Sequence, residues 1–363
     1  MPSTNEAVIA AAGSGKTKRL IDEAVADPAA RVLITTYTRE NLREIEARLW
    51  RDRRAVRCDV TAMTWFEFLL RECVKPYQCH RTGILTIRAI NFDAKPPRYA
   101  RETQFHQYYV DRVGNVYSDR VSALACNLDD LSHGAVVARI AECYDIILID
   151  EMQDLAGWDL NLVERLMKSC ARVVAVCDPR QAVYVTNYSS KNRSARGSEV
   201  VTWIEKRRKA GVLTVTEQSE SFRCNQMICD YADALYPGLP STTSRNTATV
   251  DWMGVHLVHV DDIDQYRDAT RAQELRWDRR SRFASPDAKN MGEVKGAAYD
   301  RVLILPTGTI IEHLETGVDL KPVTRAKLYV AVTRARHSVG IVTTSRTTKS
   351  SLPFWAPARR ERD

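Results

Sequence analysis

The amino-acid sequence predicts an α/β protein with doubly wound parallel sheets. Several short runs are apolar throughout instead of alternating, which is typical of parallel strands covered by helices on both faces. Amphipathic helical patterns lie between these runs, as crossover connections between parallel strands require. The expected strands cover residues 7–12, 32–36, 145–149, 172–177, 212–216, 301–305 and 339–343. The expected helices cover residues 17–26, 39–54, 158–169, 223–235, 262–277 and 325–337.

The composition supports a globular protein with more than one core. The chain has 363 residues, of which 44% are hydrophobic, so it can bury several cores. Charged residues make up 27% and aromatic residues 8%, which excludes a disordered chain. The 53 basic residues exceed the 46 acidic ones by 7, an excess that suits a polyanionic ligand without defining one.

The cysteines and the hydropathy pattern exclude several other classes of protein. None of the nine cysteines forms a C-x-x-C pair, and the nearest cluster, Cys73, Cys79 and His80, lacks a fourth ligand for zinc. No run of about 18 apolar residues is present, and the first residues do not follow the pattern of a secretion signal. We therefore expect a cytoplasmic protein with reduced thiols and no membrane partner.

The first motif with a chemical role is AAAGSGKT at residues 10–17. It lies between an expected strand and an expected helix, as a P-loop does. In such a loop the backbone amides surround the phosphates, the lysine binds the β and γ phosphates, and the hydroxyl after it binds Mg²⁺. The expected contacts with ATP and Mg²⁺ come from Gly13, Ser14, Gly15, Lys16 and Thr17. The alternative is a glycine-rich turn in another kind of α/β protein.

Two adjacent acids, Asp150 and Glu151, follow the apolar run at residues 144–149. A buried strand that delivers two carboxylates at its carboxyl end places one on the Mg²⁺ of a P-loop and the next on a water molecule. A helix N-terminus that favours acidic residues would explain either acid alone. It would not explain the pair after a fully apolar strand, so we expect Asp150 to bind Mg²⁺.

Further segments, together with these two, resemble the UvrD/Rep group of superfamily 1 helicases. They follow in that group's order as TYTR, TWFEF, DEMQD, DPRQAVY, SFR, KGAAYD and YVAVTRAR, beginning at residues 36, 64, 150, 178, 221, 295 and 329. The resemblance covers nearly the whole chain except residues 71–142. It implies two RecA-like P-loop NTPase cores: a first, ATP-binding core at 1–70 and 143–205 and a second core with arginine fingers at 206–363. Residues 71–142 would form a small inserted subdomain.

The resemblance also implies roles at the nucleotide. Lys16 would bind the phosphates and Glu151 would be the general base for the attacking water. Gln153 and Gln181 are similar to the group's γ-phosphate sensors. Arg223 and Arg334 are similar to the arginines that stabilise the transition state. Phe222 would stack on adenine, and Gly296 would lie at the nucleotide.

Contacts with nucleic acid are expected from fewer residues. By the resemblance, Tyr37 stacks on a single-stranded base, and Trp65 and Phe66 follow in the next segment that faces DNA. Arg39 and Thr64 are further candidates along the strand. Two basic groups are further candidates for phosphate contact, with solvated helix faces as the alternative. These groups are Arg48, Arg51, Arg53, Arg54 and Arg57, and Arg271, Arg276, Arg279, Arg280 and Arg282.

Two functions follow from these observations. The first is an ATP-dependent DNA helicase or translocase on single-stranded DNA or a 3′-tailed duplex, moving 3′ to 5′ as the resemblance implies, with ATP hydrolysed at the cleft between the two cores. The alternative is a nucleotide-gated DNA-binding or regulatory ATPase module of a larger complex with little unwinding, with a nuclease as protein partner. Only 72 positions separate Arg223 from Lys295, where UvrD and Rep carry a large inserted domain, and this favours the alternative. A P-loop kinase is disfavoured, because a kinase does not need the ordered segments that end at Arg334.

Overall fold

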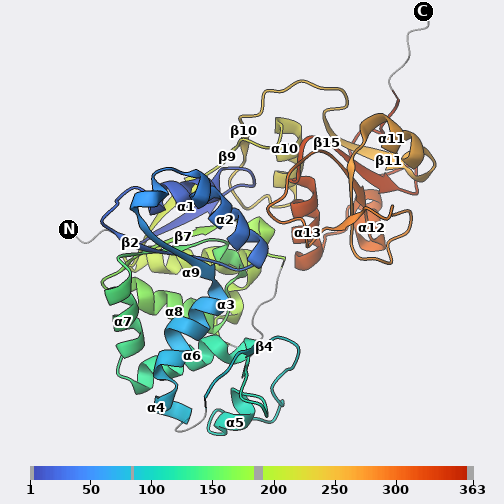
Figure 1. The fold of residues 1–363 in the computed structure, drawn as a ribbon. Coiled ribbons are helices and arrows are strands. Elements are labelled where there is room, and N and C mark those ends of the chain that lie inside the picture. Colours follow the sequence, from blue (N-terminus) through green and yellow to red (C-terminus); the bar gives the residue numbers. More distant parts are fainter. Residues whose placement is uncertain (1–3, 83–85, 184–190, 358–363) are drawn as a thin grey trace, which may run out of the picture. The chain divides into compact units, whose positions relative to one another are not determined.

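The computed structural model describes residues 4–82, 86–183 and 191–357, and its contacts divide the chain into two units (Figure 1). The first unit comprises Met1–Ile9, Lys16–Pro179 and Tyr184–Glu217. The second comprises Ala10–Gly15, Arg180–Val183 and Gln218–Asp363. Two short segments that interrupt the first unit in the sequence therefore belong to the second unit, and one of them contains most of the P-loop motif.

The first unit is built on a six-stranded sheet of order β3-β2-β6-β7-β1-β8. Its strands are β1 (Glu6–Ala10), β2 (Arg31–Thr36), β3 (Asp59–Thr64), β6 (Ile146–Ile149), β7 (Arg172–Cys177) and β8 (Thr214–Gln218). Neighbouring strands from β3 to β1 pair in parallel. Their carboxyl ends therefore meet at one edge of the sheet, here called the carboxyl edge.

Helices cover both faces of this sheet, with α1 and α2 on one side and α6, α7 and α8 on the other (Figure 1). They are α1 (Lys16–Ala24), α2 (Arg39–Arg51), α3 (Trp65–Phe68), α4 (Cys79–Thr82), α5 (Phe105–Tyr108), α6 (Val121–Leu131), α7 (Ala135–Cys143), α8 (Trp158–Met167) and α9 (Val200–Lys209). Two short strands, β4 (Ile90–Asn91) and β5 (Val116–Tyr117), pair in parallel. The α2 helix begins where the Thr38 hydroxyl accepts a hydrogen bond from the Asn41 amide.

Two of the expected domain limits differ from the structure. The expected strand at 212–216, assigned to the second core, is β8 at the edge of the first sheet, and the first unit continues to Glu217. Residues 71–142 belong to the first unit and share its core, where Leu124 and Leu128 of α6 are buried in one cluster with Leu33 of the sheet. Because this segment supplies core side chains, it is integrated into the first unit.

The second unit contains a five-stranded parallel sheet of order β11-β15-β14-β12-β13. The strands are β11 (Gly254–His259), β12 (Gln273–Arg276), β13 (Lys289–Asn290), β14 (Tyr299–Leu305) and β15 (Ala335–Thr343). The helices are α10 (Gln226–Ala234), α11 (Ile263–Thr270), α12 (Gly308–Thr316) and α13 (Pro322–Val332). A parallel pair, β9 (Glu220–Ser221) and β10 (Thr243–Ser244), lies outside this sheet.

The predicted fold class is confirmed: the protein is α/β with parallel sheets. Two expected helices extended into residues that form strands. The helix expected at 262–277 ends at Thr270, because Arg271 adopts the left-handed conformation (φ 48°) and strand β12 follows. The helix expected at 325–337 ends at Val332, and β15 begins at Ala335. Within the described residues, no helix is long and apolar enough to cross a membrane.

Candidate nucleotide and nucleic-acid site

The carboxyl edge of the first sheet collects several side chains that the sequence singles out. Tyr37 follows β2, Thr64 ends β3, the acidic pair follows β6 and Asp178 follows β7. Lys16 is the first residue of α1. In parallel α/β sheets, ligands bind at this edge, where loops from several strands converge. One edge therefore carries candidates for both nucleotide and nucleic-acid binding.

A buried lysine faces a buried glutamate at this edge. Lys16 Nζ lies 3.6 Å from Glu151 Oε1, and the two residues are 9% and 7% exposed. The Lys16 ammonium has no hydrogen-bond partner in the part of the chain that the structure describes. A buried cation normally has its donors satisfied. The free donors of Lys16 therefore suit an anionic ligand such as a phosphate.

A network of amide hydrogen bonds orients Glu151. Gln153 Nε2 donates a hydrogen bond to Glu151 Oε2, and the backbone amide of Asp178 donates to Gln153 Oε1 at 3.0 Å. Glu151 has φ 58°, in the left-handed region that non-glycine residues rarely occupy. Gln153 follows β6 and Asp178 follows the neighbouring strand β7, so residues from two loops hold the carboxylate in place. A general base needs such fixed positioning.

The neighbouring acid and hydroxyl suit Mg²⁺. Asp150 is 4% exposed, and its Oδ1 accepts a hydrogen bond from the Glu151 amide at 3.0 Å. Thr17, the second residue of α1, is half-buried. A carboxylate and a hydroxyl are oxygen ligands of the kind that Mg²⁺ prefers, and Mg²⁺ usually takes its remaining ligands from water and substrate phosphates. Among the described residues, no three His, Cys, Asp or Glu side chains are grouped so as to hold a metal by themselves. The donors present fit a metal that binds together with a nucleotide.

The glycines of the P-loop motif allow a close approach within the second unit. Gly13 and Gly15 have φ 75° and 83°. The carbonyl of Gly13 accepts a hydrogen bond from the Phe222 amide at 3.0 Å, and an added Cβ at Gly13 would lie 2.6 Å from Arg223 Cβ. The buried hydroxyl of Ser14 has no hydrogen-bond partner among the described residues. This loop therefore combines backbone that needs glycine with a free donor, as a phosphate-binding loop does.

Two arginines of the second unit meet at Thr333. Arg334, 1% exposed, donates from Nη2 to the Thr333 hydroxyl at 3.3 Å and to Gln181 Oε1 at 3.4 Å. Arg223 donates from Nη1 to the Thr333 carbonyl at 3.2 Å. The structure thus brings together Gln181, Arg223 and Arg334, which are more than 40 positions apart in the sequence. The 63% exposed ring of Phe222 is accessible for stacking.

A row of aromatic side chains begins at Tyr37. Its ring centroid lies 5.6 Å from that of Phe66, and the Phe66 centroid lies 5.0 Å from that of Phe92. Phe92 is 57% exposed, and the sequence analysis did not select it because it lies in the segment taken for an insertion. Arg39, the first residue of α2, is exposed. These side chains form a surface on which bases can stack beside a cation.

The structure buries Trp65, which the sequence analysis expected to contact nucleic acid. The indole is 1% exposed, and its Nε1 donates a hydrogen bond to Asp159 Oδ1 at 2.8 Å. Its neighbour Thr64 is an N-cap, whose hydroxyl accepts from the Glu67 amide at 3.2 Å. Helix α3 turns Trp65 inward while Phe66 stays partly exposed. The aromatic that follows in the motif, rather than the tryptophan, is therefore the accessible one.

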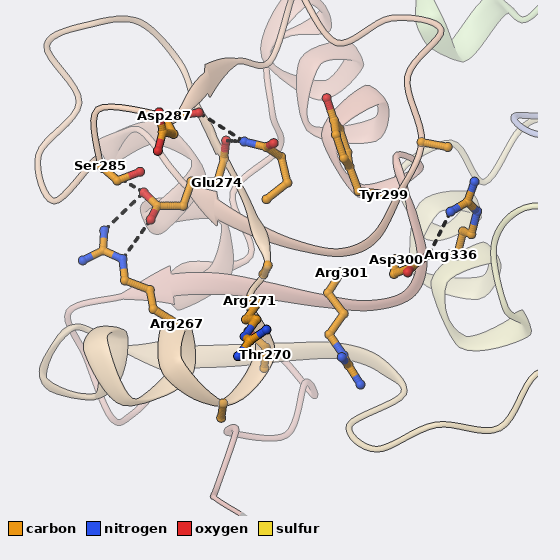
Figure 2. A pocket seen from close by; sticks show the side chains of 14 residues that line it. Arg267, Thr270, Arg271, Glu274, Ser285, Asp287, Tyr299, Asp300, Arg301 and Arg336 are labelled. Carbon is orange, nitrogen blue, oxygen red and sulfur yellow. Dashed lines mark hydrogen bonds and ion pairs between the residues drawn. The ribbon is translucent and has the colours of Figure 1, made fainter.

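A separate hollow of about 820 Å³ lies in the second unit (Figure 2). Its walls include Tyr299 and Asp300 of the KGAAYD segment together with Arg271 of a basic group. Arg336 Nη1 lies 2.8 Å from Asp300 Oδ1. Nearby, Gly296 is exposed with φ 93°. The sequence analysis treated this segment and the basic group separately, whereas the fold brings the segment and Arg271 to one cavity.

Three further residues bear on the P-loop motif or on Asp178. The Ser221 hydroxyl donates to the Ala12 carbonyl at 2.8 Å, and Gln218 Nε2 donates to the Ser14 carbonyl at 2.9 Å. Cys177 precedes Asp178 and is fully buried, which raises the pKa of its thiol to about 12. The first two side chains hold the P-loop backbone, and the thiol stays neutral. The end of the DPRQAVY segment, at residue 184, lies outside the described residues.

The fold and this site define a P-loop nucleotide-binding protein with two parallel α/β sheets. A family model described as "AAA domain" matches residues 1–187, and one described as "Viral superfamily 1 RNA helicase core domain" matches residues 132–343. Each covers more than half of the chain. The protein therefore belongs to the superfamily 1 helicase family.

Solved structures similar to this chain include the nonstructural protein 10 helicase of an arterivirus, alone and in complex with DNA. Identity is 15% and 16%, with a TM-score of 0.47 in both cases. The matches cover 93% of this chain and 59% and 60% of the helicase chains, so this chain spans about three fifths of their length. No curated protein sequence matches this chain.

Proposed function

We propose that this protein is an ATP-driven motor on single-stranded nucleic acid, of the UvrD/Rep kind, and that it moves 3′ to 5′ on DNA. The observation that carries the proposal is the buried set at the carboxyl edge, where Lys16 lies beside Glu151 and has no hydrogen-bond partner among the described residues. The aromatic row from Tyr37 lies along the same edge, at β2 and β3. Nucleotide chemistry and strand contact would then depend on one sheet.

The proposed chemistry assigns one task to each group. Lys16 and the amides of Gly13, Ser14 and Gly15 would hold the phosphates, and Thr17 and Asp150 would hold Mg²⁺. Bound there, Mg²⁺ would neutralise charge on the β and γ phosphates. Glu151 would accept a proton from the attacking water, and Gln153 would keep its carboxylate oriented through the hydrogen bond described above. Gln181, Arg223 and Arg334 would stabilise charge on the γ phosphate, and Phe222 would stack on the base.

The second candidate function is a nucleotide-gated module of a larger complex with little unwinding. The burial of Trp65 favours it, because one of the expected contacts with the strand is lost. Such a module would act with a protein partner such as a nuclease in the cytoplasm. It would share the hydrolysis chemistry and differ in strand displacement.

The test is ATP hydrolysis with and without single-stranded DNA or RNA, for the wild type, Lys16→Ala and Glu151→Gln. We expect the polynucleotide to stimulate hydrolysis and both substitutions to abolish this stimulation, because Lys16 is proposed to bind the phosphates and Glu151 to activate the attacking water. Hydrolysis that survives Glu151→Gln would contradict the role of the base. Displacement of a strand from a 3′-tailed duplex separates the two functions, because the regulatory module hydrolyses ATP and displaces nothing. Faster strand displacement from a 5′-tailed duplex than from a 3′-tailed one would contradict the proposed 3′ to 5′ direction.

A further inference from the structure

The end of helix α2 exposes a tryptophan in an arginine-rich segment. Trp50 is 91% exposed and Val56 is 86% exposed, the two largest exposures among the exposed large hydrophobic side chains of the described residues. They lie in Arg48–Arg57 (sequence RLWRDRRAVR), here called the Trp50 surface. Burial of an indole removes a large apolar area from water, a gain that the exposed Trp50 does not make. The packing of the first unit therefore gives no reason for a tryptophan at this position.

The charges of the Trp50 surface are only partly neutralised. It contains five arginines and one aspartate. Arg48 pairs with Glu44 at 2.5 Å, and Arg54 pairs with Asp52 at 2.6 Å. The remaining arginines are exposed, and their side chains make no hydrogen bond or ion pair with the residues that the structure describes. These are Arg51, Arg53 and Arg57.

The helix itself accounts for only one of these three arginines. A cation in the last turn interacts favourably with the helix dipole, which explains Arg51. Arg53 and Arg57 lie beyond the end of α2 at Arg51. Arg51 and Arg53, with Lys18 of α1, also line a hollow of about 480 Å³. Unpaired cations beside a hollow and an exposed indole need an explanation outside the fold.

Single-stranded nucleic acid is the ligand whose chemistry matches both the unpaired arginines and the exposed indole. Its phosphates pair with guanidinium groups, and its bases stack on an exposed indole. An acidic peptide would pair with the arginines, but it does not present a series of rings that can stack on the indole. A membrane surface needs a broader apolar face than Trp50 and Val56 provide.

The Trp50 surface is also distinct from the aromatic row at the carboxyl edge. Tyr37 and Arg39 lie at the N-terminal end of α2, and Trp50 lies at its other end. A helix of 13 residues is about 20 Å long at ~1.5 Å per residue. We propose that the Trp50 surface is a second binding site for single-stranded nucleic acid, which holds the strand outside the path along the carboxyl edge. This site goes beyond the proposed function, because it needs no nucleotide.

The test measures binding of the full chain to a fluorescein-labelled 30-nucleotide dT or rU strand, without ATP, over a range of salt concentrations. The variants are Trp50→Ala, Trp50→Phe and the triple Arg51→Ala/Arg53→Ala/Arg57→Ala. The matched control is Lys206→Ala/Arg208→Ala/Lys209→Ala, which removes the same charge from exposed residues at the end of α9 in the same unit. Hydrolysis is measured separately, so failure of the motor and failure of this site are distinguishable.

Trp50→Ala should weaken binding about tenfold, since stacking on one aromatic is worth about that much, and Trp50→Phe should restore most of the loss. The arginine triple should reduce the slope of log Kd against log salt by about 2, at ~0.7 per phosphate contact. The control triple should change the slope by less than half of that. The proposal is overturned by unchanged binding in the Trp50 and arginine variants, by an equal effect of the control triple, or by wild-type binding to poly-glutamate or anionic vesicles but not to the oligonucleotides.

Discussion

Replacing Trp65 by phenylalanine should destabilise the first unit in a pH-dependent way. The change keeps an aromatic ring and removes the Nε1 donor that lies 2.8 Å from Asp159 Oδ1. Burial raises the pKa of Asp159 from 3.8 to about 6, against the opposing effect of hydrogen bonds from Trp65, the Ala156 amide and Ser122. At pH 8 the carboxylate is charged and depends on these donors. Loss of a hydrogen bond to a buried charged group costs about 1.5–3 kcal/mol.

The sign of the pH dependence follows from the raised pKa. Between about pH 4 and pH 6 the folded state holds a proton on Asp159 that the unfolded state has lost, so stability falls as pH rises through this window. The difference between the two pKa values corresponds to about 3 kcal/mol for this group. Trp65→Phe removes a donor to the charged form, so it raises the pKa of Asp159 further. The cost of the substitution should be about 1 kcal/mol at pH 5 and two to three times larger at pH 8.

Urea unfolding followed by circular dichroism at pH 5 and pH 8 measures this difference. Trp158→Phe is the control: it removes a neighbouring half-buried indole, whose ring lies near Lys191, and should cost the same at both pH values. Equal destabilisation by Trp65→Phe at pH 5 and pH 8 would refute the account, because it would mean that the ring volume matters and the buried carboxylate does not.

Two glycine pairs test the steric claims by thermal unfolding. Gly13→Ala should cost at least about 2 kcal/mol, because its Cβ would lie 2.6 Å from a side-chain carbon at φ 75°, whereas Gly15→Ala, at φ 83° with open space, should cost about 1 kcal/mol from backbone strain alone. Similar losses for the two would contradict the close approach at Gly13. Gly340→Ala would place a Cβ 2.7 Å from Tyr266 Cζ and should lower stability by about 1–3 kcal/mol. Gly308→Ala, in open space at the start of α12, should be neutral or slightly stabilising, and a loss comparable with that at Gly340 would count against the packing described for β15.

The sequence predicted the parallel sheets because their strands are buried on both faces, which leaves continuous apolar runs such as residues 172–177. Strand β3 carries no such run: Asp59 is exposed and only Met63 is buried, since it lies at the sheet edge. Strand β12 was taken for the end of a helix, because its four residues are too short to show a period of their own. Arg271, between α11 and β12, adopts the left-handed conformation. An arginine, unlike a glycine, does not indicate the end of a helix in the sequence.

At the candidate site, local motifs determine the position of a residue where it directly follows a strand. The acidic pair and Asp178 follow buried strands and lie at the carboxyl edge as expected. The burial of Trp65 could not be predicted, because it depends on Asp159 of α8, which is 94 positions away in the sequence. The link from Arg334 to Gln181 spans 153 positions and likewise depends on tertiary folding.

The conformation of Glu151 has a consequence for attempts to engineer this protein. A non-glycine residue at φ 58° carries about 1–2 kcal/mol of backbone strain, which glycine would relieve. Glycine would also leave the buried Lys16 ammonium without the carboxylate that lies 3.6 Å away, and loss of one partner of a buried ion pair costs about 3–5 kcal/mol, which is more than the strain. A screen that rewards only thermal tolerance should therefore keep glutamate at this position, although its backbone conformation is strained.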